Sequence, residues 1–171
     1  MDEVVPAAVT SMSPEMFGAP LSVQFEAFLD DHRHALEASL DGLTEDQARR
    51  PMVTSKTTLL GLVKHATFVE GVWFDEAITC RSRADIGIAD APDESFDLDD
   101  RDTIVSVLRA HTAACAVSRS NTASLDVDEV VHGNRRGPLP MRWVYLHALR
   151  ELAQHEGHAD ILREHILATS T

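Results

Sequence analysis

Apolar residues recur at steps of three and four along four long segments of the chain, which is the spacing of a helix with one buried face. The first segment begins at Leu21 and ends at Gly42, since glycine commonly terminates helices. The second begins after Thr57 or Thr58 and runs to about Thr79. Both segments predict amphipathic helices.

The third segment begins between Asp99 and Asp102, where acidic side chains suit the positive end of a helix dipole, and runs to about Ser124. The fourth begins at Met141 or the proline before it and extends to about Leu167. No segment shows the alternation of apolar and polar residues that is typical of a strand. The pattern therefore predicts an all-α fold, a four-helix bundle.

The connections between these helices differ in length. After the first helix, Thr44 and Gln47 have the spacing of a capping box, which predicts a short capped turn. The connection between the second and third helices, residues 80–100, holds Gly87, Pro92 and seven acidic residues. We expect it to be a solvated crossover, long enough to carry the chain from one end of the bundle to the other.

Residues 1–20 contain three prolines and little periodicity, and they predict a loose N-terminal segment. Residues 21–168 are then expected to form one domain, because 171 residues is an ordinary length for a single domain with a full hydrophobic core.

The charge of the chain argues against two classes of partner. Acidic residues outnumber basic ones by 28 to 15, for a formal charge of −13, which repels nucleic-acid phosphates and anionic lipids. The chain has no apolar run of the roughly 18 residues that a membrane span requires, and no signal-peptide pattern follows Met1. We therefore expect a cytoplasmic protein that binds neither nucleic acid nor membrane. Cys80 and Cys115 do not form a C-x-x-C pair, and we expect two buried free thiols, with a disulfide as the alternative.

Polar residues in the fourth helix form the most informative pattern. His147, Glu151, His155 and His158 are spaced by four, four and three, so all four fall within an arc of roughly 80°. Apolar residues share that arc, which predicts that it faces the core; these residues are Val144, Ala148 and Leu162. A buried carboxylate loses several kcal/mol of solvation unless a partner compensates, and a divalent cation favours ionised carboxylate and neutral imidazole together.

Glu151 and His155, at positions i and i+4, can reach the same ion, and His65 is the candidate third ligand. His65 is the one histidine in the second helix and lies on or beside its apolar stripe. Three protein ligands leave open positions for water or substrate, which is typical of a reactive metal site.

Other interpretations of these residues remain open. His65 is also compatible with a hydrogen-bonded core histidine, and the Glu151/His155 pair with a solvated helix face. Gly157 weakens the fourth helix, which predicts a close approach of a neighbour or ligand there. Five further histidines show no organised partners and are expected at the surface or in loops; these are His32, His34, His111, His132 and His165.

Two stretches carry a resemblance to a known family. They are Leu59-Leu-Gly-Leu-Val-Lys-His65 and Trp143-x-x-x-His147-x-x-x-Glu151-x-x-x-His155-x-Gly157-His158. In order and separation they resemble the DinB-like superfamily, in particular the branch that includes the metal-binding domain of mycothiol-dependent maleylpyruvate isomerase. The likeness covers nearly all of residues 22–168.

The resemblance implies a four-helix bundle with a long crossover between helices 2 and 3, and a metal held by His65, Glu151 and His155. It also implies a transferase or isomerase that uses a low-molecular-weight thiol such as mycothiol on an electrophilic substrate, with His158 or His147 orienting ligands or moving protons. Zinc is the expected metal, with nickel, iron and manganese as alternatives, and a homodimer is expected by the same likeness. Maleylpyruvate isomerase carries a further C-terminal domain that is not part of this sequence. We therefore do not expect isomerisation of maleylpyruvate. The alternatives are a non-catalytic, metal-stabilised stress-response or binding module and, third, a ferrous oxygenase.

Overall fold

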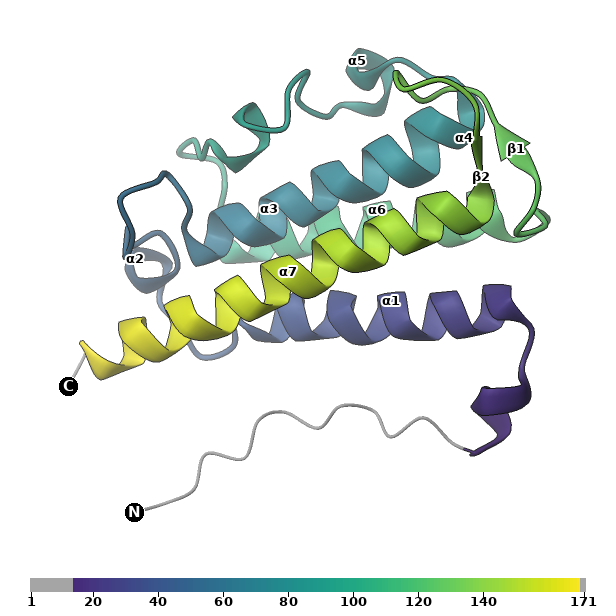
Figure 1. Ribbon diagram of the computed structural model, residues 1–171. Coiled ribbons are helices and arrows are strands. Elements are labelled where there is room, and N and C mark those ends of the chain that lie inside the picture. Colours follow the sequence, from purple (N-terminus) through teal and green to yellow (C-terminus); the bar gives the residue numbers. More distant parts are fainter. Residues whose placement is uncertain (1–13, 170–171) are drawn as a thin grey trace.

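The computed structural model describes residues 14–169, and its main body is a bundle of four long helical segments (Figure 1). The first is α1 (Leu21–Ala38) and the second begins with α3 (Leu59–Glu70). The third and fourth are α6 (Ile104–Thr122) and α7 (Met141–Ala168). α7 packs between α1 and α3, while α6 packs on α3. The predicted all-α bundle is confirmed.

The second helical segment is continuous but changes its winding. α3 passes into a π-helical turn, η2 (Gly71–Glu76), and then into α4 (Ala77–Thr79), so the whole segment ends where the sequence predicted. The side chain of Thr58 caps its start by accepting a hydrogen bond from the backbone N–H of Gly61 at 3.0 Å. π-Helical turns are uncommon and often lie near functional sites. This one carries Trp73, which contacts α7.

Shorter elements connect the helices. α2 (Glu45–Ala48) has the capping box of Thr44 and Gln47, as predicted. α6 begins later than its acidic start suggested, because Thr103 and Ser106 form its capping box. Two residue pairs form a small antiparallel sheet before α7, from β1 (Val130–Val131) and β2 (Leu139–Pro140). Of the predicted N-terminal segment, residues 1–13 lie outside the described residues, and Pro14–Gly18 form the 3₁₀-helix η1.

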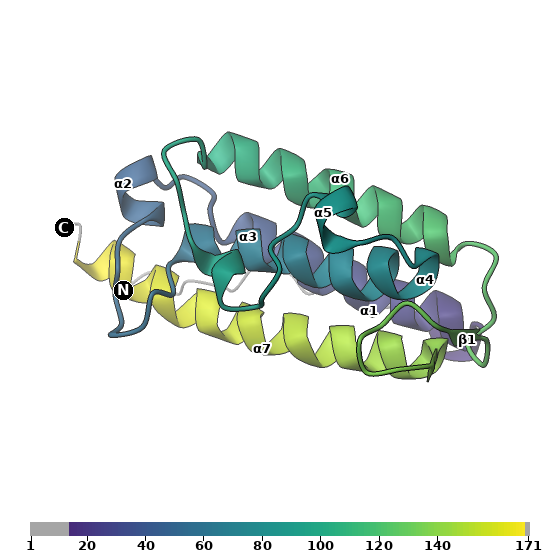
Figure 2. The ribbon, with the colours of Figure 1, turned by 90° about the horizontal axis from the view of Figure 1, so that it is seen from above.

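The crossover between α4 and α6 runs back along the bundle over α3 (Figure 2). It contains α5 (Arg83–Ile86) and the 3₁₀-helix η3 (Glu94–Phe96). Most of it is exposed, as predicted, but Ser95 is buried and Phe96 packs against the core. The expectation of a solvated crossover is therefore wrong at η3, where one face of the segment covers α3.

The core lies where the four helices meet and is built from aliphatic and aromatic side chains, among them Leu29, Leu36, Leu59, Leu62, Phe74, Leu152 and Ile166. The loop before β2 packs closely on α4, because Gly133 donates its backbone N–H to Ala77 at 2.9 Å. A Cβ at Gly133 would lie 1.9 Å from the carbonyl oxygen of Glu76, so this contact requires glycine.

The prediction that both cysteines are buried is wrong for Cys80. Both cysteines are free and Cys115 is buried, but Cys80 is exposed, because it caps the end of α4 in a left-handed conformation with φ 62°. None of the helices in residues 14–169 has the length and apolar character needed to cross a membrane.

Candidate metal centre

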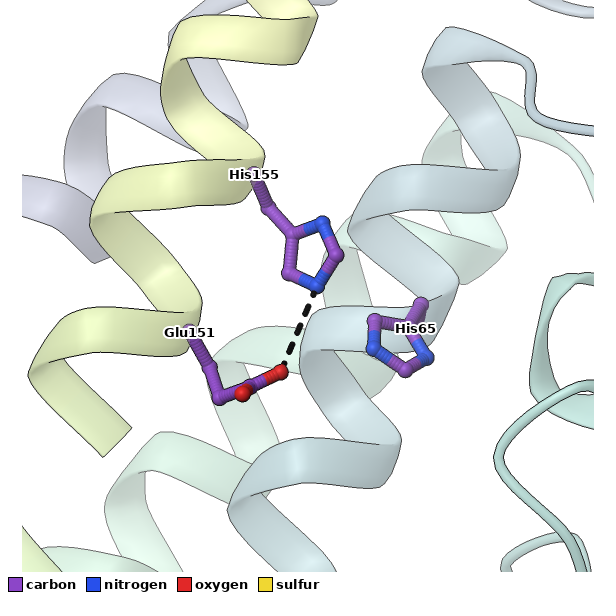
Figure 3. A group of neighbouring side chains, drawn as sticks. All are labelled: His65, Glu151 and His155. Carbon is purple, nitrogen blue, oxygen red and sulfur yellow. Dashed lines mark ion pairs between the residues drawn. The ribbon is translucent and has the colours of Figure 1, made fainter. Parts of the chain in front are cut away.

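Three predicted side chains converge between α3 and α7. Figure 3 shows Glu151 and His155 pointing from successive turns of α7 toward His65 on α3. One potential ligand atom from each residue lies within 4.8 Å of the other two, and within residues 14–169 this is the one such group of three His, Cys, Asp or Glu side chains. The structure thus brings together the three predicted ligands; their role as ligands stays a prediction.

His65 is buried, and one of its ring nitrogens is occupied. Its Nδ1 lies 2.6 Å from the hydroxyl of Ser95 in η3, and the ring of Phe96 stacks on it at 4.1 Å. The other ring nitrogen faces Glu151 and His155 (Figure 3). Burial, together with the nearby His155, lowers the pKa of His65 to about 4, although the charge of Glu151 opposes the shift. His65 is therefore neutral at pH 7 and has a free nitrogen lone pair.

Glu151 is half-buried, and its two carboxylate oxygens face different neighbours. Oε1 accepts a hydrogen bond from Arg150 at 2.9 Å and lies 3.7 Å from Nε2 of His147. Oε2 lies 3.8 Å from Nε2 of His155. Burial opposes ionisation, but the hydrogen bond from Arg150 and the neighbouring imidazoles hold the pKa of Glu151 below its ordinary value. The carboxylate is therefore charged at pH 7.

His155 presents Nε2 to Glu151, while its buried Nδ1 has no hydrogen-bond partner among the described residues. Burial lowers the pKa of His155, and its neighbour His158 adds to this effect against the charge of Glu151. Like His65, it is neutral at pH 7.

The donor set fits a divalent cation. Two neutral imidazoles and one carboxylate are ligands that zinc and other first-row metals accept, and three such ligands leave a further position open. The 3.8 Å between Glu151 and His155 is close to the separation of about 3.4 Å expected between two ligands of one tetrahedral ion. Small side-chain rotations would therefore complete such a site.

The two histidines predicted to assist the metal have different surroundings. His147 is buried between two indoles, with ring centroids 4.2 Å from Trp73 and 4.9 Å from Trp143. Arg150 donates a hydrogen bond to its Nδ1 at 3.3 Å, which leaves Nε2–H directed toward Glu151.

His158 is exposed, so the prediction that it faces the core is wrong. The arc of the four polar residues is offset from the buried stripe of α7, and His158 falls on the solvent side of that stripe; the stripe includes Val144, Ala148, Leu152, Ala159 and Leu162. Its ring is 6.0 Å from that of His155, and it lines a cavity of about 220 Å³ whose other residues are Val53, Ser55, Thr57, Ile161 and Leu162.

Two other predictions about polar and small residues are wrong. His111, expected at the surface, is fully buried on α6, with Nδ1 2.8 Å from Glu37 and Nε2 3.6 Å from Cys115. The four-residue steps from Val107 to His111 and Cys115 are the signal that places it on the inner face. For Gly157 the predicted close neighbour is absent within residues 14–169, because a Cβ there would meet none of their atoms within 4 Å; the predicted approach of a ligand stays a prediction.

Comparison with known proteins identifies the family. The model of the family described as mycothiol-S-transferase matches residues 24–168. No curated protein matches the chain. The match spans most of the chain, so the protein belongs to the mycothiol S-transferase family, and its assignment to the DinB-like superfamily is confirmed.

Proposed function

From this family membership, we propose that the chain is a divalent-metal-dependent transferase that moves the sulfur of mycothiol, or of a similar low-molecular-weight thiol, onto an electrophilic substrate. The observation that carries the proposal is the convergence of His65, Glu151 and His155 in the protonation states that a cation requires. Two neutral imidazoles and a carboxylate from separate helices form the binding site for the ion. We propose zinc as the metal.

Each residue near the site has a distinct task in this proposal. His65, Glu151 and His155 would hold the ion, which would lower the pKa of a thiol and so prepare a nucleophile at neutral pH. His147 lies with Nε2 3.7 Å from Oε1 of Glu151, and the Nε2–H dipole would favour the charged carboxylate and help to orient it. His158 is exposed beside His155 and accepts the thiol proton at a ring nitrogen, passing it to solvent.

The cavity beside His158 offers a place for the electrophile. Its apolar lining from Val53, Ile161 and Leu162 suits a hydrocarbon portion, and His158 is among its polar lining residues. When the sulfur forms its bond to the electrophilic carbon, the leaving group takes the electron pair of the bond that breaks. No oxidant or reductant is required.

Metal content tests the site. Protein purified without an affinity tag should contain close to one equivalent of metal, and Glu151→Ala should contain almost none. Glu156→Ala is a matched control, because Glu156 lies on the same helix and contacts His32 rather than the triad. Equal metal content in wild type and Glu151→Ala would remove Glu151 from the site.

Thiol binding tests the reaction class. In cobalt-substituted protein, millimolar mycothiol should perturb the visible absorption of the metal, because sulfur enters its coordination shell. An unchanged spectrum with mycothiol, bacillithiol and glutathione would overturn the thiol-transferase proposal.

One observation favours a second candidate function. The triad joins α3 to α7, so a bound ion would tie two core helices together even without turnover. A non-catalytic, metal-stabilised binding module would lose thermal stability on chelation, as the enzyme would, but it would leave the cobalt spectrum unchanged and a thiol-transfer screen silent.

A further inference from the structure

The crossover contributes a hydrogen-bonded chain that ends at His65. Ser95 is 3% exposed, and its Oγ lies 2.5 Å from the carbonyl oxygen of Pro92 and 2.6 Å from Nδ1 of His65. Water therefore has little access to the hydroxyl, and its two close neighbours are the carbonyl and the imidazole.

The number of hydrogens on each group decides which group donates in these two hydrogen bonds. A serine hydroxyl carries one hydrogen, and the carbonyl of Pro92 can only accept, so the hydroxyl donates to Pro92. Ser95 is then left with lone pairs toward His65, and the imidazole must donate. Nδ1 of His65 therefore carries the proton, and Nε2 carries the free lone pair.

We propose that Ser95 is a positioning residue for the metal site, selecting the Nδ1–H tautomer of His65 so that the Nε2 lone pair faces Glu151 and His155. This inference rests on the proposed metal-dependent function. Phe96 supports it from the adjacent position, because its ring lies nearly parallel to the imidazole, at 13°, and restricts ring rotation. Outer partners of this kind commonly raise metal affinity by about 10–100-fold.

The two histidines of the triad differ in this respect. Nδ1 of His155 has no partner among the described residues, whereas that of His65 is held by a buried hydroxyl. The ligand on α3 is therefore preset by the crossover, while the ligand on α7 takes its tautomer from whatever Nε2 binds. Loss of Ser95 should accordingly change His65 and leave His155 as it is.

The direct test is nitrogen NMR of the metal-free protein labelled with ¹⁵N at histidine. Among the nine histidines, the His65 signals are assigned by their loss in His65→Gln. Wild type should show His65 as the Nδ1–H tautomer, and Ser95→Ala should convert it to a mixture or to the Nε2–H form. Ser95→Thr, which keeps a hydroxyl, should restore Nδ1–H. A wild-type His65 protonated at Nε2 would overturn the inference.

Zinc affinity gives the second readout, by competition with a chromophoric chelator. Ser95→Ala should bind zinc about 10–100-fold more weakly than wild type, and Ser95→Thr should recover most of the loss. Ser39→Ala is the matched control, because Ser39 is also buried and donates to one carbonyl, that of Leu36 at 2.6 Å, without contact to the triad. It should bind zinc as wild type does.

The outcomes separate the two proposals. A wild-type protein that binds no zinc would overturn the metal-dependent function. Zinc binding of equal strength in wild type and Ser95→Ala, or an equal loss in Ser95→Ala and Ser39→Ala, would overturn the role of Ser95 alone.

Discussion

Two buried polar clusters connect α3 to its neighbours, and they are built on opposite plans. In the first, Arg33 of α1 lies against Glu70 at the end of α3, with two hydrogen bonds of 2.9 and 2.8 Å. Asp30 and Glu26 accept further bonds from the same guanidinium. Although burial disfavours its charge, the hydrogen bonds and charge of Glu70 raise the pKa of Arg33 above its ordinary value. This cluster carries its own cation.

The second cluster, the triad of His65, Glu151 and His155, has an anion and two lone-pair donors but no buried cation of its own. Arg150 reaches Glu151 only from the exposed side of α7. The difference teaches what to look for in a buried polar site. A set of buried groups that pair with one another needs no ligand, whereas a set that directs lone pairs from several side chains toward one point is suited to a cation.

The largest expected effect comes from removing the internal cation of the first cluster. Arg33→Met should lower the free energy of unfolding by about 3–5 kcal/mol, because it leaves Glu70 buried without a partner. The double variant Arg33→Met/Glu70→Leu should lose much less. Urea unfolding of the metal-free proteins measures both. A single variant as stable as the double would contradict the account of this cluster.

An effect of similar size should come from adding a divalent cation to the second cluster. Zinc at about 1,000 times its dissociation constant should raise the free energy of unfolding by about 4 kcal/mol, and His155→Ala should lose nearly all of this gain. Urea unfolding with and without zinc gives the values. Arg33→Met is the control and should keep the gain, since its defect lies elsewhere. An undiminished gain in His155→Ala would exclude His155 as a ligand.

The sequence predicted much of this second cluster because helical spacing is a local property. Four-residue steps place Glu151 and His155 on one face whatever the helix packs against, and an apolar stripe marks His65 as inward. The family resemblance then joined the two helices. The same reasoning predicted the bundle and the capping box of α2.

What the sequence did not predict depends on contacts between segments. Ser95 lies in an acidic, glycine- and proline-containing stretch with no periodicity, so nothing local shows that it reaches His65. The pairing of Arg33 with Glu70 was likewise not predicted, because in the sequence each residue looks like an ordinary charged side chain on the exposed face of a helix. His158 was placed too far inward because an arc of about 80° says which residues share a side, not where the solvent boundary falls.

A moderate effect should come from the pH dependence of stability at the second cluster. The pKa of His65 falls from 6.5 to about 4 on folding, so the unfolded chain binds more protons between these values. Stability from this residue is therefore present above pH 6.5 and lost as the pH falls toward 4, by about 3 kcal/mol in metal-free protein. Urea unfolding across this range should show the slope in wild type, and His65→Gln should make it less steep, with His155 accounting for part of the remainder. A slope that His65→Gln does not change would locate the acid sensitivity elsewhere.

The smallest effect concerns Gly157, which lies on the exposed face of α7 two residues after His155. A Cβ there meets no atom of residues 14–169 within 4 Å, so Gly157→Ala should raise the free energy of unfolding by about 1 kcal/mol through helix propensity alone. Zinc affinity, measured by the same chelator competition, should stay as in wild type. Gly133→Ala is the contrasting control, because its Cβ would collide with the carbonyl of Glu76 and should destabilise the protein. If Gly157→Ala instead weakened zinc binding, the glycine would be serving the second cluster by letting α7 adjust its backbone around the ion, and the donor set would be less preformed than its geometry indicates.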